Sequence, residues 1–385
     1  MKHIDKITNY CYYGLLFFLP ISTFLDNVAL LSLTFLTLFF KKRKHTLKQL
    51  LFSSLWLLFA YIILLNILDS NLETKVYIKL LPLLIIPFIF SYIKKETLEK
   101  GLLFLFIAII IKQFVAIAGI LEYYFFTEGK TVALRSYAGI NEILHFERPY
   151  LGFFSALNII VSYYLFKNRK IWIFLITSVF SFSIIVLISA RLGLIVAILS
   201  LLLIVISRIK INFKYLMLVI GTLTTLGIIF LMSNNPLKNR FQQIKYDTRL
   251  VVWNGAYNIF TETSQPFFGL KSQSKVSEKL IDYYKNDAYF EYQPDKTRFV
   301  NKGYNTHNQY LNEILRGGIF GLLLFMMPLC YLIFQNIKMK KLEFTLLLIS
   351  VSLFFMVENL LARQIGVYTT AIILSLTQKT LNEKS

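Results

Sequence analysis

The chain has 385 residues, of which 56% are hydrophobic and only 16% are charged, and its formal net charge is +20. Soluble domains carry about 25% charged residues, so this composition excludes an ordinary soluble globular protein. The basic residues lie largely in short segments between apolar blocks, and no basic stretch interleaved with aromatic residues resembles a nucleic-acid surface. The sequence therefore predicts a membrane protein without a nucleic-acid partner.

The apolar blocks are long enough to cross a membrane. Residues 171–190 and 192–207 contain no charged residue, and residues 102–118 contain one, Lys112. A run of about 20 apolar residues spans the hydrocarbon layer as a helix, because a backbone in lipid must satisfy its own hydrogen bonds. We predict an all-α membrane protein with about 12 transmembrane helices, at residues 10–25, 28–40, 50–68, 76–93, 102–123, 150–166, 171–189, 192–207, 215–232, 312–335, 342–357 and 366–378.

The second of these spans, 28–40, is short for a full crossing and also fits half of a re-entrant hairpin. The distribution of basic residues predicts the orientation. If the N-terminus is cytoplasmic, every cytoplasmic segment carries at least two Lys or Arg, whereas the short loops on the other side at 69–75, at Arg191 and at 358–363 carry one each. This bias follows the positive-inside rule. It places both termini in the cytoplasm and the loops with most of the polar motifs outside it.

The expected organisation is one membrane domain with a loop subdomain and no internal repeat. Residues 1–232 hold spans 1–9, residues 233–311 form a long periplasmic loop, and residues 312–385 hold spans 10–12. A loop of this length is too long for a passive connector. Part of it is predicted to be helical, because Val252, Ala256 and Phe260 recur at helical spacing.

Arg191 lies in a tight turn between two uncharged blocks. An arginine at this place either extends to the membrane interface or faces a polar cavity. In the second case it can bind an anion such as phosphate through its two-pronged guanidinium group. Both interpretations are compatible with the sequence.

His307 follows Thr306, which forms a capping-box pattern with Gln309. We therefore predict that a helix begins at His307. The positive end of a helix suits an anion and favours a neutral imidazole that can act as a base. A polar residue that merely lines the helix start is the alternative.

Arg249 and Trp253 lie four residues apart and thus on one face of a helix, where stacking of the two side chains is often only structural. No Gly-rich phosphate loop, no pair of carboxylates at short spacing and no His/Cys cluster for a metal occurs in the sequence. We expect an enzyme that needs no metal, no nucleotide and no other cofactor.

Four segments, in this order, resemble the superfamily of O-antigen ligases and polymerases, bacterial inner-membrane proteins that transfer glycans. They are SARLG at 189–193, the pair Arg249 and Trp253, PFFG at 266–269 and HNQYLNEILRGGIFG at 307–321. The last is the most specific, because its helix start is followed by Gly-x-x-Gly inside a span. The resemblance runs from about Arg148 to Arg363.

The resemblance implies a glycan donor on undecaprenyl diphosphate at the periplasmic face of the inner membrane, and transfer of the glycan to an acceptor hydroxyl. In ligases that acceptor is the lipid A core of lipopolysaccharide. By matched position, Arg191 and Arg249 would hold the diphosphate, and His307 would activate or place the acceptor hydroxyl. The secondary candidates are Arg148, Asn308, Tyr310, Arg363 and Lys112.

Two positions depart from the superfamily pattern. Ala190 stands where relatives often have serine, and Lys271 stands where they often have a second glycine. The sequence leaves open an O-antigen ligase, a polymerase that joins lipid-linked repeat units, and a protein O-oligosaccharyltransferase. A transporter of lipid-linked glycan is a more distant alternative, because it would place charges in the middle of several spans and repeat one half of the chain.

Overall fold

The computed structural model describes residues 2–40, 54–68, 74–126, 139–168, 170–208, 248–290 and 293–382. All regular elements in these ranges are helices. In chain order they are α1 (Lys2–Phe18), α2 (Thr23–Phe40), α4 (Ser54–Leu68), α5 (Thr74–Leu80), α6 (Pro82–Tyr92), α7 (Lys95–Phe126), α8 (Ile140–Ile143), α9 (Arg148–Phe166), α10 (Ile171–Leu187), α11 (Arg191–Arg208), α14 (Thr248–Glu262), α15 (Gln273–Asn286), α16 (Gln293–Lys302), α17 (Gln309–Lys338), α18 (Leu342–Phe355), η2 (Leu360–Ala362) and α19 (Gln364–Asn382).

The predicted all-α fold is confirmed for this part of the chain. Each predicted span overlaps a helix except the ninth, 215–232, which lies outside the described residues. Six helical segments among the described residues are long and apolar enough to cross a membrane: Thr23–Phe40, Thr74–Tyr92, Lys95–Phe125, Arg148–Phe166, Arg191–Arg208 and Gln309–Lys338. The count of twelve spans stays a prediction.

The first two helices differ from their predicted bounds. The first span was expected at 10–25, but α1 ends at Phe18 and α2 begins at Thr23. Pro20 lies in the turn between them, where its missing N–H group and fixed φ disfavour a continuous helix. The start at Thr23 lengthens the second helix to 18 residues, so it is long enough for a crossing.

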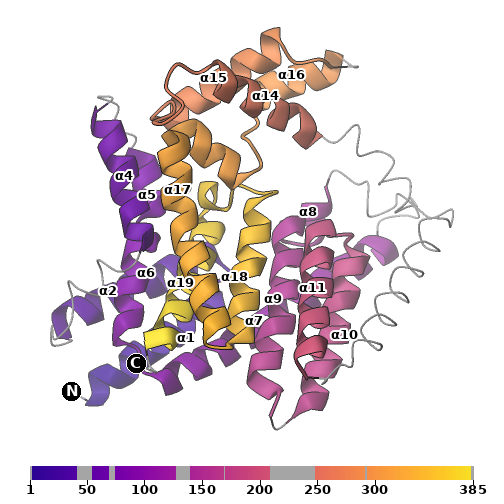
Figure 1. Ribbon diagram of the computed structural model, residues 1–385. Helices are drawn as coiled ribbons and strands as arrows, with labels where there is room; N and C mark the ends of the chain where they lie inside the picture. Colours follow the sequence, from indigo (N-terminus) through magenta and orange to yellow (C-terminus); the bar gives the residue numbers. More distant parts are fainter. Residues whose placement is uncertain are drawn as a thin grey trace.

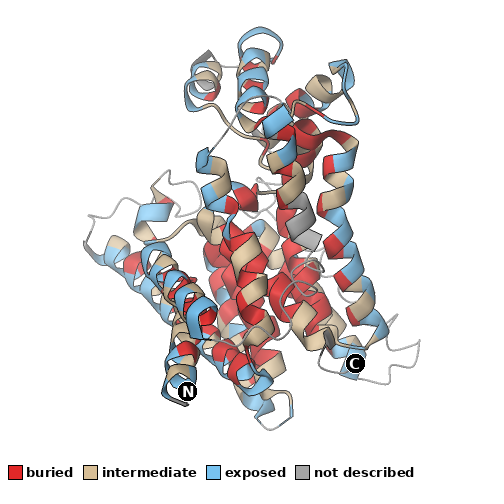
Figure 2. Ribbon diagram, turned by 90° about the vertical axis from the view of Figure 1, so that its left-hand side faces the viewer, coloured by how far each residue is buried: buried red, intermediate tan, exposed pale blue. Residues whose placement is uncertain are grey.

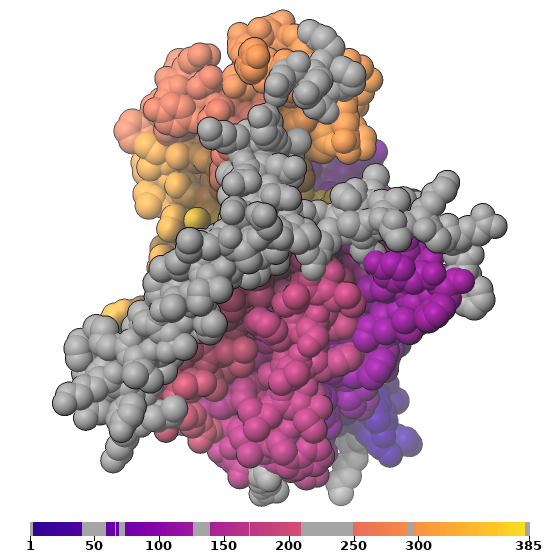
Figure 3. All heavy atoms as spheres, turned by 90° about the vertical axis from the view of Figure 1, so that its right-hand side faces the viewer, coloured from indigo at the N-terminus to yellow at the C-terminus, as the bar shows by residue number. Residues whose placement is uncertain are grey.

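Figure 1 shows the described helices as a bundle with the α14–α16 helices at one end. Both chain termini lie toward the opposite end of the bundle. Figure 3 shows the surface of α9–α11 in magenta, with the orange α14–α16 helices beyond one end of it. The segment predicted as a long loop therefore contains a helical subdomain, and the helix expected around Val252 to Phe260 is confirmed as part of α14.

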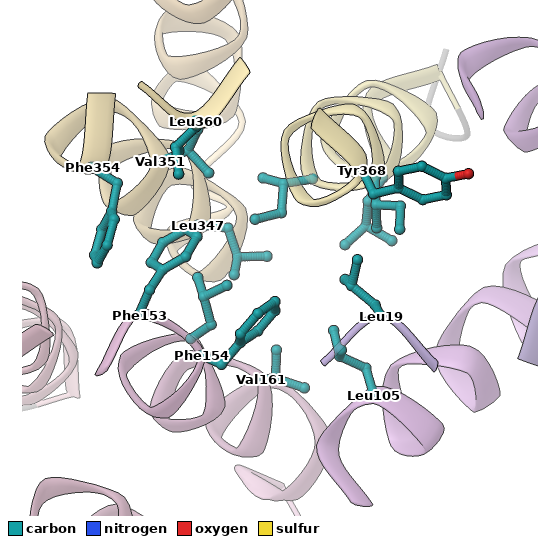
Figure 4. Close-up of a cluster of buried hydrophobic side chains, with 14 of the residues drawn as sticks. Leu19, Leu105, Phe153, Phe154, Val161, Leu347, Val351, Phe354, Leu360 and Tyr368 are labelled. Carbon is teal, nitrogen blue, oxygen red and sulfur yellow. The ribbon is translucent and has the colours of Figure 1, made fainter. Parts of the chain in front are cut away.

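Helix α9 lies at the centre of the bundle. All its residues from Tyr150 to Tyr163 are buried, and it packs against α7, α10, α11 and α18. Phe153 on α9 meets Phe354 on α18 with ring centroids 3.9 Å apart (Figure 4). This contact joins the start of α9 to the end of α18, next to the polar residues described below.

The bundle is apolar outside and contains polar side chains within. Phe39 on α2 and Val179 on α10 are 70% and 68% exposed, whereas Gln113 on α7 is buried and donates to Ser155 at 2.8 Å and to Ser181 at 3.1 Å. Figure 2 shows the burial concentrated in the middle of the bundle. Apolar outer faces and hydrogen-bonded polar residues between helices are typical of membrane proteins.

Helix α17 is interrupted at Gly318, whose φ of 64° and ψ of −162° are not helical. Residues 309–317 and 319–338 are therefore two helical pieces. Gly269, the last residue of the PFFG segment, also has a positive φ of 63° and lies directly against the interruption, since a Cβ on it would lie 2.5 Å from the Gly318 nitrogen. Only glycine adopts such backbone angles without strain.

Backbone hydrogen bonds join the PFFG segment to both pieces of α17. Leu270 N donates to Leu315 O at 2.8 Å before the interruption, and Ile319 N donates to Pro266 O at 3.0 Å after it. The PFFG segment thus satisfies backbone groups that an unbroken helix would have paired with each other. Two motifs that are far apart in the sequence form one structural joint. This joint fixes residues 309–317, the upper piece of α17.

Candidate functional site

Glu358 brings two of the predicted site residues together. Its Oε1 lies 3.1 Å from Arg249 Nη2 and its Oε2 lies 3.5 Å from His307 Nδ1. Arg249 stands in the first turn of α14, His307 precedes α17, and Glu358 follows α18. The three side chains are partly shielded, with exposed fractions of 33% for Arg249, 29% for His307 and 16% for Glu358.

The prediction that a helix begins at His307 is wrong. Helix α17 begins at Gln309, and Asn308 is its N-cap, with the Asn308 side chain accepting a hydrogen bond from Leu311 N at 3.1 Å. His307 has a φ of 45° and lies before the helix. Asparagine is a better N-cap than threonine, and the Thr306 side chain makes other contacts, so the expected capping box does not form.

Those contacts anchor the residue next to His307. The Thr306 side chain is buried, and its Oγ1 accepts from Asn359 Nδ2 at 2.9 Å. The Thr306 carbonyl accepts from Trp253 Nε1 at 3.1 Å. Thus Arg249 and Trp253, the pair expected on one face of a helix, both reach the segment that carries His307, one through Glu358 and the other through Thr306.

Arg191 is the first residue of α11 and is exposed. The turn before it is tight, with Ser189 at a φ of 53°. A Cβ on Gly193 would lie 2.7 Å from the Gly152 carbonyl, so the starts of α9 and α11 pack closely together. Since Phe153 near the start of α9 meets Phe354 near the end of α18, Arg191 lies at the end of the bundle that also carries Glu358.

The secondary candidates have varied surroundings. Lys112 Nζ donates to the His145 carbonyl at 2.9 Å and lies over the Phe146 ring. The Tyr310 hydroxyl donates to the Ser352 carbonyl at 3.1 Å. These contacts give Lys112 and Tyr310 packing roles between helices.

Arg148 begins α9, and its backbone N donates to Asn141 Oδ1 at 2.9 Å. Arg363 pairs with the Glu147 carboxylate. Glu147 and Arg148 are neighbours in the sequence, so this ion pair ties the segment after η2 to the start of α9. Both arginines thus lie at the end of the bundle that carries Glu358.

The sequence interpretation missed a buried ion pair in the upper piece of α17. Arg316 Nη2 lies 2.8 Å from Glu313 Oε2, and the two side chains are 5% and 1% exposed. Gln309 Nε2 donates to Glu313 Oε1 at 2.6 Å, and Gln309 Oε1 accepts from Leu361 N at 3.0 Å. The spacing of Glu313 and Arg316, three residues apart on a helix, was the available signal.

The N-cap gives a first testable expectation. Asn308→Ala removes the acceptor for the Leu311 N–H, so we expect a loss of about 1 kcal/mol of stability. The measurement is the Tm of the purified protein in detergent. Asn301→Ala, at an exposed asparagine of α16, is the control and should leave the Tm unchanged. An equal Tm for the two variants would contradict the capping role.

The apolar bundle and its polar cluster at one end define a multi-pass membrane protein with a candidate site at that end. Residues 176–326 match the family model described as O-Antigen ligase. The predicted resemblance to the O-antigen ligase superfamily is thereby confirmed. The matched range includes Arg191, Arg249 and His307, whereas Glu358 lies beyond it. No curated protein matches the chain.

Proposed function

We propose that the protein is a membrane glycosyltransferase of the O-antigen ligase type. Its donor is a glycan on undecaprenyl diphosphate, and its acceptor is a hydroxyl group of the lipid A core. The observation that carries this proposal is the convergence of Arg249 and His307 on Glu358, at the end of the bundle where Arg191 begins α11. The family match, which includes both arginines and His307, supports it.

The chemistry needs a base and a cationic site. The acceptor oxygen attacks the anomeric carbon of the donor sugar, and the bond from that carbon to the diphosphate oxygen breaks. His307 takes the proton of the acceptor hydroxyl. Arg249 and Arg191 bind the diphosphate and stabilise the negative charge that grows on it as it leaves. These residues supply all the groups that this transfer requires, without a metal or a nucleotide.

The proposed site faces the periplasm of a bacterial inner membrane, with both termini in the cytoplasm. The charge distribution of the sequence supports this orientation. The placement of the α14–α16 helices and the two termini at opposite ends of the bundle is consistent with it (Figure 1). The partners are then the lipid-linked donor, the glycan acceptor and the surrounding lipids.

The test is the lipopolysaccharide of cells that lack the protein, separated on a gel. Loss of polymer from lipid A together with accumulation of lipid-linked polymer supports a ligase. Lipid A that carries a single repeat unit indicates a polymerase that joins repeat units. Unchanged lipopolysaccharide contradicts the proposed acceptor, and the products to examine next are glycosylated proteins, as an O-oligosaccharyltransferase would make.

Arg249→Gln provides the matching variant in the same cells. It removes a cation from the proposed diphosphate site, and we expect polymer on lipid A to fall about 10²–10³-fold. Arg298→Gln, at an exposed arginine of α16, is the control for charge loss and should complement fully. Full complementation by Arg249→Gln at equal protein level would contradict the role of Arg249.

A further inference from the structure

We propose that Glu358 is a positioning residue with two tasks: it holds His307 in the tautomer that can act as a base, and it occupies the anion position of Arg249 until the donor diphosphate replaces it. This inference rests on the proposed function. Glu358 lies outside the family match at residues 176–326. The structure alone brings it to the two residues on which the proposed reaction depends.

The two oxygens of Glu358 have separate partners. Oε1 lies 3.1 Å from Arg249 Nη2, and Oε2 lies 3.5 Å from His307 Nδ1. A carboxylate that is only 16% exposed is poorly screened by water, so it attracts both cationic and N–H groups more strongly than a surface carboxylate does. Glu358 is therefore placed to influence both residues at once.

The backbone around Glu358 is fixed in register with the backbone around His307. Glu358 N donates to Phe354 O at 2.9 Å and continues the last turn of α18. The following residue, Asn359, donates to Thr306 at 2.9 Å, and Thr306 directly precedes His307. Two adjacent residues on one segment thus pair with two adjacent residues on the other. A positioning residue needs this kind of support, because a loose carboxylate cannot select one tautomer.

The contact at Nδ1 determines which ring nitrogen is available for catalysis. A carboxylate has no proton to donate. At 3.5 Å its negative charge attracts an N–H at Nδ1 and repels a lone pair there, so it favours the His307 tautomer with the proton on Nδ1, which leaves the Nε2 lone pair for the acceptor hydroxyl. After Nε2 takes that proton, the same carboxylate stabilises the imidazolium, as the aspartate does in the Ser-His-Asp triad.

The contact at Arg249 has a different consequence. A carboxylate and a phosphate bind guanidinium with the same geometry, so Glu358 fills the place that a donor phosphate oxygen would take. When the diphosphate binds, Arg249 exchanges the carboxylate for phosphate. Of its two partners, Glu358 then contacts only His307. Donor binding and activation of the base are thereby coupled through one side chain.

Glu358→Gln tests both tasks, since glutamine keeps the shape and loses the charge. Its amide can donate to Nδ1 as readily as it accepts from it, so the selection of the tautomer is lost. In protein labelled with ¹⁵N histidine, the His307 signals, assigned by their absence in His307→Asn, should change from the Nδ1–H form in the wild type to a mixture. We expect kcat to fall about 10- to 100-fold, with the KM for the lipid-linked donor unchanged or lower because Arg249 has lost its internal competitor.

Glu343→Gln is the matched control. Glu343 stands at the other end of the same helix, α18, and pairs with Lys167. This variant loses an ion pair of α18 without touching the site, and it should change neither the tautomer nor kcat. It separates a loss of helix stability from a loss of positioning, and the Tm of both variants is recorded beside the kinetics.

The two readouts distinguish this inference from the proposed function. If the wild type transfers no glycan, the proposed function fails, while the ¹⁵N signals still decide whether Glu358 selects the tautomer. A His307 tautomer that is identical in Glu358→Gln and the wild type overturns the positioning role. A raised KM for the donor with unchanged kcat overturns the exchange at Arg249, because Glu358 would then assist donor binding.

Discussion

His307→Asn should reduce glycan transfer by about 10²–10⁴-fold, the usual contribution of a general base, while the protein still folds and inserts. Asparagine is the appropriate replacement because His307 has a φ of 45°, and asparagine tolerates the left-handed region better than alanine does. The variant thus removes the imidazole without straining the backbone. Its amide cannot take a proton from the acceptor hydroxyl, so the loss reports on the chemical step.

His145→Asn is the control for this experiment. His145 also has a positive φ, 47°, and its side chain is exposed. The measurement is the lipopolysaccharide profile of cells that lack the native protein and carry one of the two variants at equal level. The expected profile is normal for His145→Asn and devoid of polymer on lipid A for His307→Asn. A normal profile for both would refute the catalytic role of His307.

Gly318→Ala should destabilise the protein by about 3–5 kcal/mol, because two costs coincide at this residue. The backbone there has a φ of 64°, and a Cβ would lie 2.3 Å from the carbonyl carbon and oxygen of Phe267. Since these are backbone atoms, they cannot rotate away as a side chain can. The variant must therefore either displace the PFFG segment or straighten α17, and both changes break the backbone hydrogen bonds of the joint.

Gly14→Ala is the matched control, since a Cβ on Gly14 would make only ordinary contacts, the nearest at 3.5 Å to Phe18. The Tm and the yield of monodisperse protein in detergent are measured for both variants. We expect a marked decrease for Gly318→Ala and little change for Gly14→Ala. Equal stability of the two variants would show that the joint between the PFFG segment and α17 does not form.

The helices were predictable because a backbone in lipid must satisfy its own hydrogen bonds, and a helix does so within a single segment. Wherever an apolar block was long enough, it predicted a helix, and each such block among the described residues overlaps a helix. The errors lie at helix ends. Pro20 separates α1 from α2 through its own ring, a local effect that the apolar pattern does not show. The cap of α17 is Asn308, because the Thr306 side chain is used in contacts with a distant segment that spacing alone does not reveal.

The site was predictable only in part. The residue types at positions 249 and 307, an arginine and a histidine in polar surroundings, indicated an anion site with a base. Because Arg249 and His307 are far apart in the sequence, nothing predicted that both contact the same carboxylate. Glu358 is 51 positions after His307, outside the four segments that carry the resemblance, and it was not among the predicted site residues. The interruption at Gly318 and the ion pair of Glu313 and Arg316 depend on how distant segments meet, and no local pattern encodes that.

The central position of α9 has a consequence for the way the protein is made. Of the six candidate spans among the described residues, α9 has the lowest hydropathy and the largest buried share, and buried Asn158 and Ser155 lie within it. A helix of this kind is unfavourable as an isolated span in lipid, since its polar groups find hydrogen-bond partners only between helices. Its partner α18 is synthesised nearly 200 residues later. During synthesis α9 can therefore pack first only against α7, α10 and α11. The later insertion of α18 completes the packing around α9 and brings Glu358, which follows α18, to the site.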